Sequence, residues 1–306
     1  MSDQYLNVNN EFLGTDNTWV RVGTVMSLHM KSLLSGRTIV AKDYVCTDVG
    51  LTASLENSTI IRKNTIVIYD VTDNCIQQNK FYHKLQDLTI KNISNFVVRF
   101  EVLGMSELVV NALELIRNAK PIVCKMSFCD KYLVEVNCID CGEKAAKWIS
   151  GYLEHSNLRL AYVSAEPEHE CQFWYWLRKL RKLESDDRNI VMPYASIPRY
   201  TLLSYQSLTE LNRTSTHHLT LEQLNPDICI MPRFVAPFNE LEWDWILIGN
   251  AIMKNIRPWK SSRVKLVPEQ MPIDMKMNMM LLHCELQASG NVQVGDGVYV
   301  RQIKKK

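Results

Sequence analysis

Short β-prone segments follow one another along the first half of the chain, and they constrain the fold more than any other feature. They are rich in Val, Ile, Tyr and Thr and are separated by Asp, Asn, Ser and Gly, as strands and their turns are. The clearest are residues 18–28, 37–46, 64–70, 95–104, 120–128 and 131–138. Because no long helix intervenes, the order excludes βαβ units and predicts an antiparallel sheet or barrel, in a β-rich α+β fold.

Composition and charge exclude several classes of protein. The chain has 306 residues, of which 46% are hydrophobic and 22% are charged, so collagen, coiled coil and bulk disorder are excluded. Lys and Arg number 35 against 33 Asp and Glu, which leaves a net charge of +2. A protein that grips nucleic acid through its overall field needs a stronger bias, so no nucleic acid partner is predicted.

Cysteine usage and the terminal segments predict a soluble, cytoplasmic protein. The nine cysteines are odd in number, and most lie in apolar runs, which favours buried free thiols in a reducing compartment. The polar, acidic start lacks the features of a signal peptide, and no run of about 18 apolar residues predicts a membrane span. The end, RQIKKK, is a basic tail, read as a solvated terminus or as weakly attracted to an anionic surface.

Two helices are predicted from capping and spacing. Asp140 and Glu143 have the spacing of a capping box before residues 142–153. Apolar residues then recur at helical intervals, at Ala145, Trp148, Ile149, Tyr152 and Leu153. Ser204 is expected to cap a shorter helix in SYQSLTELN.

A further amphipathic helix is predicted over residues 170–184. Its apolar stripe consists of Phe173, Trp176, Leu177 and Leu180. Its basic flank consists of Arg178, Lys179, Arg181 and Lys182. One interpretation is a surface helix that packs its stripe on the core, and the other is a helix that binds a protein partner or a membrane surface.

Common catalytic and metal motifs do not account for the function. Cys138 and Cys141 have CxxC spacing, but they supply two ligands where zinc needs four, so a structural role is expected. His217 and His218 are adjacent, and neighbouring side chains of a strand point to opposite faces. GxSxG, GxxxxGK[ST], HExxH and GxGxxG are absent, and no metal site is predicted. Residues 294–298 (VGDGV) predict a tight hairpin turn.

An ordered set of segments resembles the mitochondrial amidoxime-reducing component and its MOSC-domain relatives. The segment VNCIDCGEKAAKWISGYL resembles the family's strand–Asp-Cys-Gly–helix joint, and residues 19–36 resemble its opening strand and cofactor loop. Further similar segments follow in the family's order at residues 200–212, 224–230, 243–267 and 290–300.

The resemblance implies an N-terminal β-barrel-like domain followed by a MOSC-type β-barrel domain with a few flanking helices. We place a flexible lead-in at residues 1–17, the first domain at 18–155 and the MOSC domain at 156–306. The resemblance also implies a molybdenum cofactor between the domains and the reduction of N-hydroxylated compounds with electrons from cytochrome b5. Relatives in the wider superfamily handle or sulfurate the same cofactor. Mitochondrial association is implied only by this resemblance, and the family's N-terminal membrane anchor is not found.

The residue that should bind molybdenum differs from the family's pattern. The family's ligand is the cysteine of an Arg-Cys pair, which here corresponds to Ser261-Ser262, and no cysteine lies between Cys229 and Cys284. A serine hydroxyl has a far higher pKa than a thiol and is a hard ligand, so Ser262 is a poor substitute for a soft thiolate.

Several cofactor-binding cations are also replaced. The family's Lys-Ser corresponds to Leu34-Ser35, its Asp-Arg to Lys63-Asn64 and its Arg-Pro-Asn to Asn225-Pro226-Asp227. Of these positions Ser35 is retained, whereas Leu34, Asn64, Asn225 and Asp227 are degenerate. The lost Lys and Arg side chains would have formed charge-assisted bonds to phosphate or pterin oxygens, so the sequence predicts that the cofactor has been lost.

Three functions remain open. The first is a MOSC-fold pseudoenzyme with a degenerate cofactor site, which acts as a binding or scaffolding module. The second is an active molybdenum-cofactor oxidoreductase or cofactor-sulfur-handling protein, in which Cys229 or Cys284 supplies the sulfur. The third is a peripheral interaction protein that uses the 170–184 helix and the basic tail.

Overall fold

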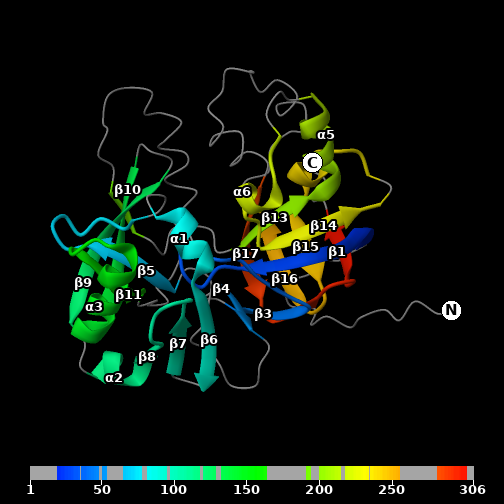
Figure 1. Ribbon diagram of the computed structural model, residues 1–306. Coiled ribbons are helices and arrows are strands. Elements are labelled where there is room, and N and C mark those ends of the chain that lie inside the picture. The colour runs from blue at the N-terminus through cyan, green and yellow to red at the C-terminus, as the bar shows by residue number, and fades with distance from the viewer. Residues whose placement is uncertain are drawn as a thin grey trace.

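The computed structural model describes most of the chain. The described residues are 19–34, 36–47, 50–53, 65–77, 81–94, 97–117, 120–128, 132–163, 191–193, 200–214, 218–233, 235–255 and 281–301. They form two adjacent lobes, a β-barrel and a second lobe of smaller sheets and helices (Figure 1).

Seven of the described strands close into the barrel, since β1 pairs with both β19 and β14 (Figure 1). In spatial order the strands are β14 (Ile228–Pro232), β13 (Tyr200–Ser204), β17 (Leu282–Ala288), β16 (Ala251–Asn255), β15 (Trp245–Ile248), β19 (Gly297–Arg301) and β1 (Val20–Met30). β2 (Ile39–Ala41) extends the sheet beyond β1. The predicted β-rich α+β fold with a barrel is therefore confirmed.

Strand β1 shows how the sequence positions the barrel wall. The residues of β1 that are buried in the core include Val22, Val25, Leu28 and Met30. The alternation of buried and exposed side chains changes where the β1–β14 register shifts, between Val25 and Ser27. A bulge of this kind turns the following side chains to the other face of the strand. After it, Ser27 and His29 lie on the face opposite Leu28 and Met30.

The second lobe contains two described sheets with three helices around them. Its larger sheet has β5 (Ile66–Asp70), β9 (Pro121–Phe128), β10 (Tyr132–Asp140), β11 (Leu158–Val163) and the short β12 (Val191–Pro193). Its smaller sheet has β6 (Thr89–Ser94), β7 (Val97–Glu101) and β8 (Leu108–Asn111). The helices are α1 (Tyr82–Asp87), α2 (Ala112–Arg117) and α3 (Gly142–Leu153). One hydrophobic cluster contains both Leu28 of the barrel and Trp148 of α3, so the two lobes share a core.

The remaining elements pack around the barrel. β3 (Asp43–Thr47), β4 (Gly50–Ala53) and β18 (Gly290–Gln293) form a three-stranded sheet. Two helices and one 3₁₀ turn complete the described elements, namely α5 (Tyr205–Thr214), α6 (Leu221–Leu224) and η3 (Asn239–Glu242). The domain boundary after residue 155 stays a proposal. Strands from before this boundary pair with strands from after it in both lobes. In the barrel β1 pairs with β14, and in the second lobe β5 pairs with β11.

The predicted helix at 142–153 is present, but its capping box is wrong. Ala145, Trp148, Ile149 and Leu153 are buried, as the spacing predicted. Cys141 is the N-cap residue, and its own side chain makes no capping bond. Asp140 Oδ1 nevertheless accepts a hydrogen bond from the N–H of Gly142, the first helical residue, at 2.8 Å. Glu143 instead pairs with Arg159, whose guanidinium lies 2.8 Å away. Glu143 therefore forms an ion pair with Arg159 of the neighbouring strand β11 in place of the predicted capping hydrogen bond.

The predicted cap at Ser204 is confirmed. Helix α5 begins at the next residue, and Ser204 Oγ accepts a hydrogen bond from the backbone N–H of Ser207 at 3.3 Å. This bond satisfies one of the backbone donors that a helix start leaves unpaired. The helix predicted at residues 170–184 and the last five residues of the basic tail lie outside the described residues.

Candidate functional site at one end of the barrel

Leu34 lies where β1 leaves the barrel and meets the second lobe. Its N–H donates to the carbonyl oxygen of Ile66 at 3.0 Å, and the N–H of Ile66 donates to Ser32 at 2.9 Å. The Leu34 side chain packs against the apolar cluster of the second lobe. The Leu34 side chain therefore makes apolar contacts at a position where the family resemblance implies a cation. Ser35 and Asn64 lie outside the described residues.

Asn225 and Asp227 lie between α6 and β14. Asn225 ends α6 in the left-handed conformation, with φ of 47°. Asp227 is 2% exposed, and its Oδ2 accepts hydrogen bonds from the N–H and the hydroxyl of Thr201, at 2.7 and 2.9 Å. The N–H of His29 donates to the Asp227 carbonyl oxygen at 2.9 Å. Asp227 therefore joins β13 and β1 across the barrel wall.

These contacts bring Asp227 and Leu34 to the same end of β1, because Asp227 bonds to His29 and Leu34 follows His29 by five residues. Asn255, the last described residue before Ser262 in the sequence, lies at this end as well. Asn255 at the end of β16 is opposite Cys284, and Cys284 is opposite Tyr200, the neighbour of Thr201. Ser262 itself lies outside the described residues, so its convergence with Leu34, Asn64 and Asn225 remains a prediction.

The ionisable groups at this end have mixed charge. His29 Nε2 lies 2.7 Å from Ser27 Oγ. Burial lowers the pKa of His29, and the positive charge of Lys31 lowers it further. The negative charges of Asp227 and Glu222 raise this pKa but do not cancel the effect of burial. Lys31 is 7% exposed. Among the described groups that act on His29, two carboxylates accompany one lysine, so an anionic ligand would meet repulsion as well as attraction from them.

The two cysteines that could replace the missing ligand are buried. Cys229 and Cys284 are both 0% exposed. Burial raises the pKa of Cys229 to about 11 and raises that of Cys284 further, with a smaller contribution from Asp227. A molybdenum ligand must be a deprotonated thiolate with open space beside it. The described residues therefore do not fit a molybdenum–thiolate centre.

The other described cysteines do not form a metal site either. Cys138 is buried beside Cys124, and Cys141 is half-buried at the start of α3. In the described part of the chain no group of three His, Cys, Asp or Glu side chains could hold a metal ion. His218 is exposed, and His217 lies outside that part.

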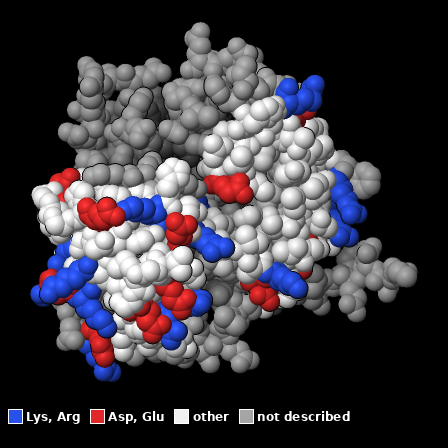
Figure 2. Space-filling model, viewed as in Figure 1, with Lys and Arg blue, Asp and Glu red and all other residues white. Residues whose placement is uncertain are grey.

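Charged side chains are interspersed on the visible face of the second lobe (Figure 2). Several of them form ion pairs, including Lys84–Glu154, Lys91–Glu101 and Arg99–Glu107. Pairs of this kind leave little field of a single sign. In the described residues, no helix has the length and apolarity that a bilayer crossing requires.

Sequence reasoning missed two features near this end. His29 near the end of β1 and Lys31 just after it are two residues apart, and this spacing could have marked a polar face where the strand ends. The other feature is a pocket between β2 and β6, which involves residues far apart in the sequence and has no local signal.

No family model matches the sequence. Mitochondrial amidoxime reducing component 2 is 24% identical in the rat and 23% in humans, each over 236 residues that cover 77% of this chain. The bovine protein is 27% identical over 157 residues, which cover 50% of this chain and 41% of that protein. The longer matches span 64% of the rat and human proteins. The chain is thus distantly similar in sequence to the amidoxime reducing components and spans less than two thirds of their length. The YUAD protein from Bacillus subtilis aligns over 94% of this chain and 100% of its own, with 8% identity and a TM-score of 0.36, too low to bear on the fold.

Proposed function

We propose that this chain is a MOSC-type relative of the amidoxime reducing components with a degenerate cofactor site, and that it acts as a non-catalytic binding or scaffolding module. One observation carries the proposal. The sequence has no cysteine between Cys229 and Cys284, where the family resemblance implies the thiolate ligand and aligns Ser262 with it. A serine hydroxyl stays protonated at neutral pH and is a hard donor, so it does not replace a thiolate on molybdenum.

The surroundings of the described positions support this proposal. Leu34 contributes apolar packing, and the carboxylate of Asp227 is engaged by Thr201. Neither side chain offers the positive charge that a phosphate-bearing cofactor requires. The loss of several such contacts weakens anion binding cumulatively, since each charge-assisted bond is worth about 1.5–3 kcal/mol.

Metal analysis of the purified full chain tests the proposal. The protein is expressed in a host that makes molybdenum cofactor, beside human amidoxime reducing component 2 as a positive control. We expect substoichiometric molybdenum and no reduction of benzamidoxime in the presence of cytochrome b5 and its reductase. The Ser262→Cys variant should remain inactive, because the cations are missing as well. Stoichiometric molybdenum with N-hydroxy reduction by the unmodified chain would refute the proposal.

The alternative is an active molybdenum-cofactor oxidoreductase or a protein that handles cofactor sulfur. Distant homology to proteins named for amidoxime reduction favours it. In this case Cys229 or Cys284 supplies the sulfur, and full burial of both thiols counts against it. Cys229→Ser and Cys284→Ser variants discriminate, since any turnover that depends on either thiol must vanish in one of them.

The partner and the location are also proposals. The basic flank of the 170–184 segment suits a protein partner or an anionic membrane surface, and the relatives' name suggests mitochondria whereas composition suggests cytoplasm. Reversing charge at Arg178, Lys179, Arg181 and Lys182 should abolish co-sedimentation with anionic vesicles or capture of a partner. Unchanged association would contradict a role for this segment.

A further inference from the structure

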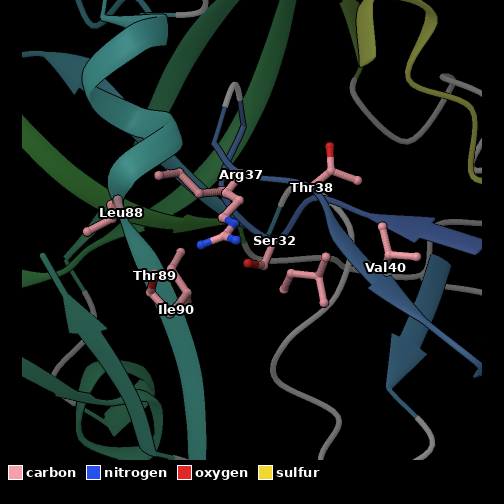
Figure 3. Close-up of a pocket in the computed structure, with 9 residues that line it drawn as sticks. Ser32, Arg37, Thr38, Val40, Leu88, Thr89 and Ile90 are labelled. Carbon is pink, nitrogen blue, oxygen red and sulfur yellow. The ribbon is translucent and has the colours of Figure 1, made fainter. Parts of the chain in front are cut away.

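A pocket of about 290 Å³ lies where the barrel meets the second lobe. One wall comes from the end of β1 and from β2, and the other comes from the junction of α1 and β6 (Figure 3). The lining residues are Ser32, Leu33, Arg37, Thr38, Ile39, Val40, Leu88, Thr89 and Ile90. Its volume lies just below the range of about 300–1,000 Å³ that is common for ligand sites, so its ligand is small.

The walls of the pocket are held in place by contacts outside it. Gln86 of α1 donates from its side-chain amide to the carbonyl oxygen of Gly36 at 3.1 Å, which links the two walls. Leu33 and Leu88 are 1% and 2% exposed and anchor opposite walls in the shared core. The pocket is therefore largely formed before any ligand binds, which lowers the cost of ordering on binding.

The lining combines apolar walls with one cation. Leu33, Ile39, Leu88 and Ile90 supply aliphatic surface. In Figure 3 the Arg37 guanidinium and the Ser32 hydroxyl point into the same space. Among the described residues no carboxylate lines the pocket. Arg37 is exposed to solvent at its mouth, and no ion pair joins it to another described residue. The pocket therefore offers a guanidinium fork and a hydroxyl donor beside hydrocarbon.

We propose that this pocket binds a small organic carboxylate with a compact apolar group. Guanidinium binds a carboxylate through two parallel hydrogen bonds, and the Ser32 hydroxyl can donate a third. Arg37 is the one cation among the described lining residues, and its charge matches that of a monoanion. The aliphatic lining then contacts the remainder of the ligand. Of the described positions assigned to the degenerate cofactor site, Leu34, Asn225 and Asp227 do not line this pocket, and the inference is argued from its own lining residues.

Calorimetric titration of the full chain with matched probes tests the inference. Benzoate carries the proposed charge, and benzyl alcohol is its neutral counterpart of similar shape. We expect saturable binding of benzoate that is roughly tenfold or more tighter than binding of benzyl alcohol, since a charge-assisted bond contributes at least that factor. Arg37→Gln should remove this preference, and Arg37→Lys should restore part of it, because lysine keeps the charge but lacks the fork.

Two further variants identify the site and control for general charge effects. Thr89→Phe places a ring in the cavity and should abolish binding of both probes. Arg21→Gln removes an exposed cation from β1 outside the pocket and should change nothing. Circular dichroism establishes that each variant is folded. The inference is overturned if benzoate does not saturate, if both probes bind equally, or if Arg37→Gln or Thr89→Phe leaves benzoate binding intact.

Discussion

Arg159 and Asp140 form a two-point ion pair, in which the guanidinium Nε lies 2.7 Å from Oδ2 and Nη2 lies 2.7 Å from Oδ1. The Tyr69 hydroxyl donates to Oδ2 at 2.6 Å, and the Gly142 N–H donates to Oδ1 at 2.8 Å. Burial opposes ionisation of Asp140, but these hydrogen bonds outweigh it and lower the pKa of the carboxyl. One carboxylate thereby joins β5, β10 and β11 to the start of α3.

Removing Arg159 should destabilise the second lobe. Arg159→Ala leaves a buried carboxylate without its cation, and we expect the free energy of unfolding to fall by about 3 kcal/mol. Arg159→Lys should recover only part of this, because lysine keeps the charge but cannot form both bonds. Urea unfolding at pH 7 measures the effect. Arg213→Ala is the control, since its pair with Glu210 is exposed on α5. Equal effects of the two alanine variants would contradict the role of Asp140.

Glu240 should make stability depend on pH. It is 2% exposed, and burial raises the pKa of its carboxyl to about 7, although hydrogen bonds from Ser207 and backbone N–H groups oppose the shift. A raised pKa means that the folded state binds the proton more tightly, so stability is lost as the pH rises from about 4.5 to about 7. The loss amounts to about 3 kcal/mol.

Glu240→Gln removes this titration, and its unfolding free energy relative to the unmodified protein should rise between pH 5 and pH 8. Comparing the two proteins at each pH cancels the other groups that titrate in this range. Glu210→Gln changes a carboxylate that is only half-buried on α5, and it should show no such trend. A constant difference between Glu240→Gln and the unmodified protein would show that Glu240 does not titrate there.

Gly23 should be essential to barrel closure. A Cβ at this position would lie 2.4 Å from the carbonyl oxygen of Met231 on β14, so the strands must separate to admit it. Overpacking of this kind costs about 1–3 kcal/mol, and we expect Gly23→Ala to lower the thermal midpoint. Gly151→Ala is the matched control, because nothing lies within 4 Å of its Cβ in helix α3. It should stabilise the protein by about 0.5–1 kcal/mol. The reverse order of midpoints would contradict the β1–β14 contact.

Thiol labelling should distinguish buried cysteines from possible metal ligands. At pH 8 we expect iodoacetamide to modify Cys229 and Cys284 more than about 100-fold more slowly in the folded protein than in urea, because burial suppresses both access and the thiolate. Peptide mass spectrometry measures each rate. Folded-state rates within about tenfold of the unfolded rates would place a thiol at an open site and favour the active-enzyme alternative.

The positions taken from the family resemblance are only partly accounted for by the described structure. Leu34 and Asp227 lie at the same end of β1, and their part in a shared site stays a prediction. Ser35, Asn64 and Ser262 stay predictions. The resemblance assigned these positions to a cofactor site. It gave no information on the hydrogen bonds that the Asp227 carboxylate accepts from Thr201.

The sequence by itself determined the local elements. The periodic apolar residues of α3 and the Ser204 cap of α5 depend on neighbours within one or two helical turns, so spacing was enough to predict them. Only the tertiary structure decided the partners. β1 pairs with β14, which follows some 200 residues later. Arg159 forms an ion pair with Glu143, which the spacing had assigned to a capping box. The pocket that includes Arg37 is formed by residues from both lobes. Periodicity specifies which face of an element is buried, whereas the identity of what covers that face depends on the packing of the whole chain.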